Sequence, residues 1–220
     1  VDSNNTWIAN DYYMNKQIQM SGSYKSKDLK IKHGHFIYYY ENGNKLSEGR
    51  YVNDKKEGKW TTWHENGEKK SEGNIINDKY NGDWVYYFDN GKKKSEGKYI
   101  DNLSEGIWKY WHKSGEKKSE GKFINDYKEG VWNYWYTNGQ LKIEEIYIKG
   151  KIDSITGYFE NGKINFKGAY VKEKEQGEWT YWNVEGRVFY KSVFNKGKRE
   201  GIWIRYFPNG ELKITYENGV

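Results

Sequence analysis

The chain has 220 residues, of which 31% are charged and 35% hydrophobic, and its mean hydropathy is -1.16. So polar a composition is typical of disordered proteins, but aromatic residues make up 19% of the chain, which predicts a core built from large rings. The absence of Cys excludes disulfides, thiolate nucleophiles and Cys-based metal sites, and no apolar run is long enough for a transmembrane segment.

The formal net charge is +6, with 37 basic and 31 acidic residues. An excess of this size permits weak attraction to acidic partners such as anionic lipid, nucleic acid or an acidic protein. An ordinary solvated surface with interleaved charges explains the same composition.

The first 33 residues match the rest of the chain only in part. Val1–Asn5 contains neither an initiator Met nor a signal peptide, as expected of a processed mature chain or of a trimmed one. Residues 12–24 resemble half of the repeat described below, with Gly22-Ser23-Tyr24 matching its second strand. We interpret residues 1–33 as a degenerate half-repeat or cap.

Residues 34–220 repeat with a period of 24 residues, and we interpret them as eight tandem repeats. Gly opens seven of the eight repeats, and a second Gly follows nine residues after the opening position in all eight. Ten of the 11 Trp fall on two repeat positions. The first, the core column, holds Phe36, Trp60, Trp84, Trp108, Trp132, Ile155, Trp179 and Trp203. The second, the outer column, holds Tyr39, Trp63, Tyr87, Trp111, Trp135, Tyr158, Trp182 and Tyr206.

Asn precedes the second Gly in six repeats, as in Asn42-Gly43 and Asn66-Gly67. Asn-Gly between aromatic runs predicts a β-hairpin with a two-residue type I′ turn. Both residues of such a turn have a positive φ, which Asn and Gly adopt most readily. Each repeat is therefore expected to form one hairpin, followed by a polar connection such as residues 53–57. The predicted fold class is all-β: an elongated single-sheet solenoid of tandem antiparallel β-hairpins.

A two-residue loop also predicts what faces the core column. Each core-column residue is then opposite the residue 13 positions later, which is Gly in the first four repeats. An aromatic ring over a strand glycine is a known way to stabilise a sheet. We therefore expect Trp60 over Gly73, Trp84 over Gly97 and Trp108 over Gly121.

Strand alternation places the core column and two later positions of each repeat on one face. Those two positions hold Lys and Ser in the first four repeats and turn apolar from the fifth. An exposed apolar stripe of that length indicates a site for a protein partner or for self-association, whereas tighter curvature that buries the stripe would make it core. The candidate partner-binding residues are Leu141, Ile143, Ile164, Phe166, Val188, Tyr190, Leu212 and Ile214.

The sixth repeat departs from the pattern at a junction near residues 150–157. It has Asp153 in place of the opening Gly, Ile155 in place of Trp, and one residue fewer before it. A bend or hinge at this junction is a hypothesis that the rotation between successive repeats would test.

The run from Gly82 to Tyr99, Gly-Asp-Trp-Val-Tyr-Tyr-Phe-Asp-Asn-Gly-Lys-Lys-Lys-Ser-Glu-Gly-Lys-Tyr, resembles the bacterial variant of the MORN repeat, and similar runs cover residues 34–220. The resemblance implies an interaction module. Members of this family include scaffolds, phospholipid-associated segments, and bacterial proteins classed as antitoxins or found at the cell surface. No fixed functional residue follows from the resemblance.

No residue cluster predicts catalysis, a metal site or a cofactor. His64 and His112 share one repeat position, where other repeats have Tyr or Phe, which favours a stacked structural role. His33-Gly34-His35 lacks a third metal ligand nearby.

Five glutamates, one in each of the first five repeats, also share one position. Equivalent residues two strands apart lie roughly 9.5 Å from one another, too far to share an ion. Lys94, Lys118 and Lys142 are expected on the same face, where they would screen the acids. We interpret the set as a surface charge ladder, and the mixed charges argue against a nucleic-acid partner. The glutamates are Glu48, Glu72, Glu96, Glu120 and Glu144.

The leading hypothesis is a non-catalytic scaffold that binds another protein, as an interaction module or an antitoxin-like neutralising partner. A first alternative is an exported bacterial surface or adhesion-type module, favoured by the missing initiator Met and Cys, which places the chain outside the cytoplasm or at the surface. A second alternative is a peripheral protein that binds anionic phospholipid through Lys and aromatic side chains. Enzyme activity would require a further domain.

Overall fold

The computed structural model describes residues 6–220, so the expectation about a leader, which concerns Val1–Asn5, lies outside the described residues. In the described part all regular structure is β, with 19 strands and no helix, which confirms the all-β prediction. The chain divides into an N-terminal half, Val1–Gly115, and a C-terminal half, Glu116–Val220.

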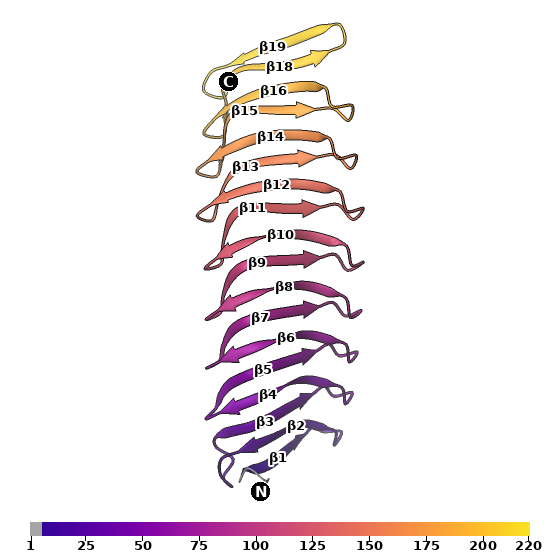
Figure 1. Ribbon diagram of the computed structural model, residues 1–220, viewed down its shortest axis with the longest axis vertical. Helices are drawn as coiled ribbons and strands as arrows, with labels where there is room; N and C mark the ends of the chain where they lie inside the picture. Colours follow the sequence, from indigo (N-terminus) through magenta and orange to yellow (C-terminus); the bar gives the residue numbers. More distant parts are fainter. Residues whose placement is uncertain (1–5) are drawn as a thin grey trace. The chain divides into compact units, whose positions relative to one another are not determined.

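In each half, antiparallel strands follow one another in chain order and are joined by short turns (Figure 1). The tandem antiparallel hairpins predicted from the repeat are therefore present in both halves. The N-terminal half contains β1 (Trp7–Tyr12), β2 (Ile18–Tyr24), β3 (Lys32–Tyr39), β4 (Lys45–Val52), β5 (Lys55–Trp63), β6 (Lys69–Ile76), β7 (Lys79–Tyr87), β8 (Lys93–Ile100) and β9 (Leu103–Trp111).

The C-terminal half continues the pattern, except that β16 pairs with both β17 and β18. Its strands are β10 (Lys117–Ile124), β11 (Tyr127–Trp135), β12 (Leu141–Ile148), β13 (Lys151–Tyr158), β14 (Ile164–Val171), β15 (Lys174–Trp182), β16 (Val188–Asn195), β17 (Lys198–Arg199), β18 (Gly201–Phe207) and β19 (Gly210–Tyr216).

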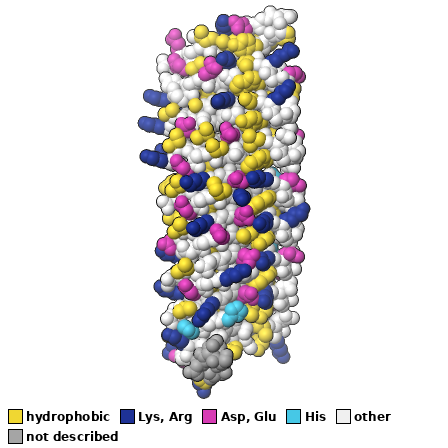
Figure 2. Space-filling view, viewed as in Figure 1, with side chains coloured by type: hydrophobic (Ala, Val, Ile, Leu, Met, Phe, Trp, Pro, Cys, Tyr) yellow, Lys and Arg dark blue, Asp and Glu magenta, His cyan; other side chains and the backbone are white. Residues whose placement is uncertain are grey.

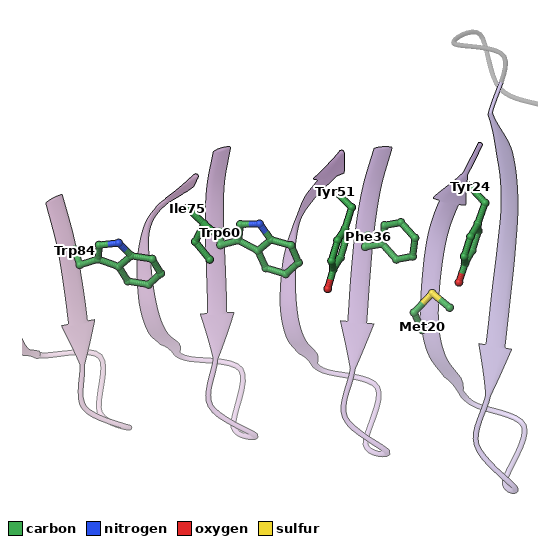
Figure 3. Packing of buried hydrophobic residues seen from close by; sticks show 7 residues of the cluster. All are labelled: Met20, Tyr24, Phe36, Tyr51, Trp60, Ile75 and Trp84. Atoms are coloured by element: carbon green, nitrogen blue, oxygen red, sulfur yellow. The ribbon is translucent and has the colours of Figure 1, made fainter. Parts of the chain in front are cut away.

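The core column buries one face of the sheet in each half, which we call the core face. In the N-terminal half, Phe36 is fully buried and Trp60 and Trp84 are 3% exposed. Figure 3 shows them in a row with Tyr51 and Ile75, which project between them. The rings of Tyr51 and Trp60 meet edge to face at 5.2 Å, the geometry that aromatic quadrupoles favour.

In the C-terminal half the column is buried again at Trp132, Trp179 and Trp203, which are 2%, 6% and 9% exposed. Phe123 and Trp132 repeat the edge-to-face contact at 4.8 Å. Large aromatic rings thus form the core of a chain whose mean hydropathy is low.

Each core-column indole except that of Trp203 lies against the strand glycine of the preceding repeat. The predicted pairing of Trp60 with Gly73 and of Trp84 with Gly97 is correct as strand register. However, a Cβ on Gly73 would lie 2.2 Å from Cδ2 of Trp84, and one on Gly97 2.2 Å from Cδ2 of Trp108. The predicted ring placement is therefore wrong.

In this orientation the indole nitrogens of Trp84, Trp108, Trp132 and Trp203 donate to a carbonyl of the preceding strand, whereas those of Trp60 and Trp179 are buried without a partner in the described residues. Trp84 Nε1 donates to the carbonyl oxygen of Asn74 at 3.1 Å, and Trp132 Nε1 donates to that of Lys122 at 3.0 Å. Both carbonyls belong to the preceding strand and lie beside a β-bulge, where the ladder is interrupted. Leaning across this strand gives the N–H of these four indoles a partner.

The predicted type I′ turn is found in the polar connection between repeats, and not in the Asn-Gly turn within each repeat. In the Asn-Gly turn, His64 N donates to Glu68 O at 2.8 Å, and among the three loop residues only Gly67 has a positive φ, of 89°. This is a three-residue loop, not a type I′ turn. The type I′ turn is in the polar connection, where Asn77 and Asp78 have φ of 49° and 66°.

A β-bulge explains why the predicted register still holds. The register shifts between Thr62, which pairs with Ser71, and Trp63, which pairs with Lys69. The bulge compensates for the extra loop residue. It also turns Lys69 to the face of Trp63, which we call the outer face, whereas the sequence predicted the core face.

The opening glycines are at a second bulge, between repeats. Gly82 has a φ of 75°, and the register there shifts by two residues, from Asn74–Asn81 to Gly73–Trp84. In the sixth repeat the shift is one residue shorter, and Asp153 is not among the residues with positive φ. The smaller bulge thus explains both the missing residue and the missing Gly of the sixth repeat. A hinge at this junction stays a prediction.

The last repeat has a different register from the predicted one. Trp203 pairs with Ile214, where the repeat pattern predicts Tyr216. Phe207 pairs with Gly210 around Pro208 and Asn209, and no bulge interrupts β18 and β19. Without the bulge the strands keep one register along their whole length.

The N-terminal segment has the same ring-to-glycine contact as the repeats. β1 pairs with β2, and β2 pairs with β3. A Cβ on Gly22 would lie 2.1 Å from Cε1 of Phe36. This contact supports our proposal that the segment up to residue 33 is a half-repeat that caps the sheet.

Candidate functional site

The outer face of the N-terminal half carries a ladder of paired charges. Lys69 Nζ lies 2.9 Å from Glu72 Oε1 and 5.8 Å from the ring centroid of Tyr87 in the next repeat. Lys45 and Lys93 make equivalent contacts with Glu48 and Glu96. The charge ladder is therefore present, but the lysines that contact the acids are those that the bulge turns to this face, together with Lys59 and Lys109 on neighbouring strands, and not the predicted Lys94 and its equivalents.

The charge of Glu72 is compensated by two lysines of this ladder. Hydrogen bonds from Lys59 and Lys69 lower the pKa of Glu72 to about 2, and a third comes from the hydroxyl of Tyr87. A carboxylate held by two ammonium groups has little capacity left for a partner.

On the outer face of the C-terminal half the same positions are apolar from Leu141 onward, whereas Lys117, at the start of this half, still lies 2.6 Å from Glu120. Where Trp63 pairs with Lys69, Trp135 pairs with Leu141 and Trp182 with Val188. Tyr158 likewise pairs with Ile164. At these three positions the cross-strand partner of the outer column is aliphatic, although Lys117 Nζ of the preceding repeat lies 4.6 Å from the ring centroid of Trp135.

A neighbouring set of cross-strand pairs changes in the same way. In the N-terminal half these pairs are polar, as in Lys59–Asn74 and Asp83–Lys98. In the C-terminal half they include Val131–Ile146 and Glu178–Val193. Sequence reasoning missed Val131, Ile146 and Val193, although the position of Ile146 and Val193 holds only polar or charged residues in the first four repeats.

These apolar side chains are accessible. Val131 is 48% exposed and Ile164 is 38% exposed, and Leu141, Ile146 and Val188 are half-buried. A separate hollow in the same half is lined by residues that include Ile124, Tyr127 and Lys149. Figure 2 shows hydrophobic side chains lying among charged ones on the visible surface. We call Val131, Leu141, Ile146, Ile164 and Val188 the apolar outer patch.

The predicted partner-binding stripe is divided between the two faces. Leu141, Ile164 and Val188 are on the outer face, because the bulge turns them there. Ile143, Phe166 and Tyr190 are on the core face, each paired with a core-face residue of the preceding strand. The prediction that all project on the face of the core Trp residues is wrong.

The core-face members contribute to packing. A Cβ on Gly157 would lie 2.2 Å from Cε1 of Phe166, so the Phe ring covers this glycine. Tyr190 meets Trp203 edge to face at 5.6 Å. In the last repeat, Ile214 pairs with Trp203, and Leu212 and Ile214 are 50% and 45% exposed.

A polar cluster occupies the core face where the Trp column is interrupted. Glu145 stands at the strand-glycine position and pairs with Ile155, which has no indole to cover it. Lys128 Nζ lies 3.7 Å from the carboxylate of Glu145 and donates to Tyr147 Oη at 3.2 Å. Burial lowers the pKa of Lys128, and the adjacent Glu145 opposes this shift. The charges satisfy one another, which is typical of a structural ion pair.

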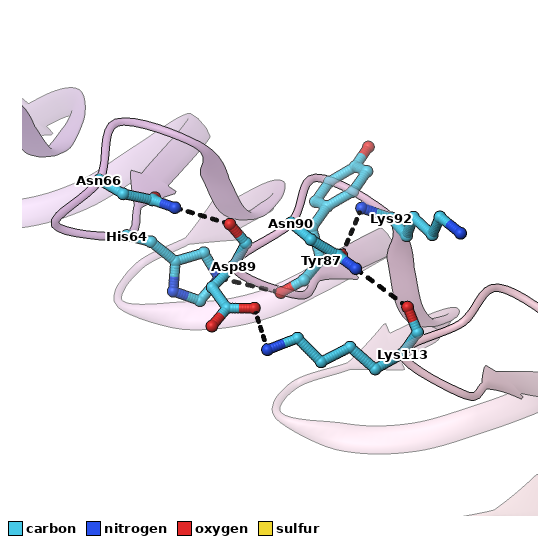
Figure 4. A network of polar contacts seen from close by, with 7 residues as sticks. All are labelled: His64, Asn66, Tyr87, Asp89, Asn90, Lys92 and Lys113. Atoms are coloured by element: carbon cyan, nitrogen blue, oxygen red, sulfur yellow. Dashed lines mark hydrogen bonds and ion pairs between the residues drawn. The ribbon is translucent and has the colours of Figure 1, made fainter.

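His64 forms a structural hydrogen bond. Its Nε2 donates to the carbonyl oxygen of Tyr87 in the next repeat at 3.1 Å (Figure 4). Tyr40 and Tyr136, at the same repeat position, donate to Trp63 and Tyr158 in the same way. Tyr40, His64 and Tyr136 therefore link successive repeats by hydrogen bonding, where the sequence predicted ring stacking, whereas His112 Nε2 is buried without a partner in the described residues.

Within residues 6–220, no three His, Asp or Glu side chains come together as a possible metal site. The described residues also contain no helix long and apolar enough to cross a membrane.

Comparisons with known proteins place these repeats in a family. The model of the MORN repeat variant matches residues 32–53, 56–77, 80–101, 104–125, 128–149 and 199–218, which is more than half of the chain. The irregular sixth repeat and the seventh lie outside the matched ranges. No curated protein matches.

Two solved structures are similar at low identity. A GtfA/B complex bound to UDP and GlcNAc is 13% identical, over 50% of this chain and 22% of that chain, with a TM-score of 0.24. A TcdB2-TccC3 structure is 11% identical, over 98% of this chain and 16% of that chain, with a TM-score of 0.24. The chain thus spans less than a quarter of each, and TM-scores this low support no statement about function.

With six matched segments in register with its hairpins, the chain belongs to the MORN repeat variant family.

Proposed function

We propose that the chain is a non-catalytic binding module that holds a partner protein on the apolar outer patch of its C-terminal half. Membership in a repeat family supports a binding role in general. The observation that carries the proposal is the exchange of Trp63–Lys69 for Trp135–Leu141 at equivalent positions of one fold.

The exchange of lysine for aliphatic residues beside the outer column favours a binding role, because the fold forms equally well with lysine at these positions. In the N-terminal half, lysine and glutamate cover the outer column and leave the sheet intact. Aliphatic side chains at the same positions leave apolar surface exposed to water. Full burial of one such side chain would contribute about 1.5–3 kcal/mol at most. A partner that covers the patch recovers part of this free energy.

The charges beside the patch indicate the kind of partner. Lys167 is on the outer face, between Thr156 and Thr180 on the adjacent strands, and forms no ion pair in the described part of the chain. The nearby Lys191 is already paired with Glu178 at 2.9 Å. A partner surface with aliphatic or aromatic side chains and one carboxylate opposite Lys167 fits this arrangement.

The experiment uses a displayed library of random peptides as the probe. Peptides selected on the wild-type chain are measured against an outer-face variant, Leu141→Ser with Ile164→Ser and Val188→Ser. The matched control replaces Lys45, Lys69 and Lys93, at the same repeat position of the N-terminal half, by Ser. We expect the selected peptides to lose about tenfold or more in affinity for the outer-face variant and to bind the control normally.

Equal binding to wild type and outer-face variant would overturn the proposal. So would selected peptides without apolar side chains. Vesicles containing anionic lipid form a second arm: binding that salt weakens and that the outer-face variant retains would favour the phospholipid role instead.

A further inference from the structure

The Asn-Gly turns form a hydrogen-bonded ladder along one edge of the repeats. Asn66 Nδ2 donates to the carbonyl oxygen of Asp89 in the next turn at 2.6 Å, and Asn66 Oδ1 accepts from Glu68 N at 3.1 Å. Figure 4 shows this contact and its repetition at Asn90, whose Nδ2 donates to Lys113 O. Asn42 and Asn161 make the same two bonds.

Asn-Gly is also the dipeptide in which deamidation is least hindered, because Gly offers no side chain to block the attack. The Gly nitrogen loses its proton to a base and attacks Cγ of Asn, and a C–N bond forms as ammonia leaves. Water then opens the resulting succinimide at either carbonyl and leaves Asp or isoaspartate. The net change is one water consumed and one ammonia released.

The reaction requires that the Gly nitrogen lose its proton and that Asn Cγ approach that nitrogen, and the hydrogen bonds of the turn ladder oppose both. Gly67 N donates to His64 O at 2.9 Å, so its proton is held in a hydrogen bond. The two bonds of Asn66 hold the side-chain amide toward Glu68 N and Asp89 O. Rotation of Cγ toward the Gly nitrogen would break both bonds, which slows the attack.

Two Asn-Gly pairs lack these bonds. The side-chain amides of Asn209 and Asn218 form no hydrogen bond within residues 6–220. Asn138 is intermediate: its Oδ1 accepts from Gln140 N at 3.0 Å, but its Nδ2 has no acceptor in the described structure. These seven asparagines are all exposed, so exposure does not distinguish them. The eighth Asn-Gly pair, Asn81-Gly82, differs from them because Asn81 is half-buried and its Nδ2 donates to Asp101 Oδ1 at 3.1 Å.

We propose that Asn209 and Asn218 are spontaneous deamidation sites of the folded chain, and that the turn ladder protects Asn42, Asn66, Asn90 and Asn161. The reaction at Asn209 adds a negative charge and, as isoaspartate, an extra backbone carbon in the turn between β18 and β19. This inference does not depend on the proposed binding function.

The test is peptide mapping by mass spectrometry after incubation in mildly alkaline buffer, with and without concentrated urea. In buffer, we expect Asn209 and Asn218 to convert first, Asn138 next, and the four ladder asparagines several-fold more slowly. In urea, all seven should convert at similar rates, because they share the Asn-Gly sequence and the ladder is gone.

Equal rates at all seven sites in buffer would overturn the proposal. A rate for Asn138 equal to that of Asn161 would overturn the part assigned to the Nδ2 bond. Persistence of the order in urea would show that sequence context, and not the ladder, sets the rates.

Discussion

The indole of Trp84 covers Gly73 of the preceding repeat so closely that a Cβ there would lie 2.2 Å from Cδ2 of the ring. Each core-column Trp except Trp203 thereby joins its own hairpin to the preceding one. Stability is thus expected to depend on neighbour contacts between repeats, as in other repeat proteins.

Replacement of Gly73 by Ala is expected to lower the free energy of unfolding by about 1–3 kcal/mol, because the added methyl forces the indole from its place. Urea unfolding followed by Trp fluorescence measures the change. Lys70→Ala, at an exposed position of β6, is the control and should change stability by less than about 0.5 kcal/mol. An unchanged midpoint for Gly73→Ala would contradict the contact.

The sixth repeat offers a test by exchange. Ile155→Trp alone should destabilise the chain, because Glu145 occupies the place where the indole would lie. Glu145→Gly together with Ile155→Trp should recover stability, with a coupling free energy of about 0.5–3 kcal/mol in a double-mutant cycle. Additive effects of the two substitutions would show that they do not share a site.

The turn ladder predicts a cost for Asn66→Ala. The substitution removes the bonds to Asp89 O and from Glu68 N, which should lower the free energy of unfolding by about 1–3 kcal/mol. Asn209→Ala is the matched control and should be nearly neutral, since Asn209 makes no such bond in the described residues. Equal losses for the two variants would rule out the ladder as the cause.

Glu72 predicts a pH dependence. Its pKa is lowered from 4.5 to about 2, so the folded state gains stability above pH 4.5 that is lost as the pH falls toward 2. Glu72→Gln should therefore be less stable than wild type near neutral pH, and the difference should vanish at low pH. Urea midpoints across this range measure it, and a constant difference would contradict the ion pairs.

The sequence alone predicted the hairpins, the core column and the pairing of Trp60 and Trp84 with their glycines, because a 24-residue period repeats each signal many times; the register of the last repeat was predicted wrongly. It predicted the wrong turn at Asn66-Gly67, since the Asn side chain acts as a link between turns and does not adopt the positive φ of a type I′ turn. The register survived because the bulge at Trp63 compensates for the longer loop.

That bulge also explains the error in the candidate site. Alternation along an ideal strand places Leu141 and Ile143 on one face, but an extra residue between them turns Leu141 outward. A bulge has no simple sequence signal here, because the inserted position is an ordinary Lys. The apolar character of the residues was visible in the sequence; their division between two faces was not.

The most direct test compares two triple variants of the C-terminal half by urea unfolding. Leu141→Ser with Ile164→Ser and Val188→Ser changes the apolar outer patch and should cost less than about 1.5 kcal/mol, because these side chains are only half-buried or exposed. Ile143→Ser with Phe166→Ser and Tyr190→Ser changes the core face, where the side chains are also half-buried but Phe166 covers Gly157 and Tyr190 packs on Trp203, and should cost roughly 3 kcal/mol or more. Equal losses, or a larger loss for the outer triple, would contradict the division of the apolar residues into a core and a binding surface.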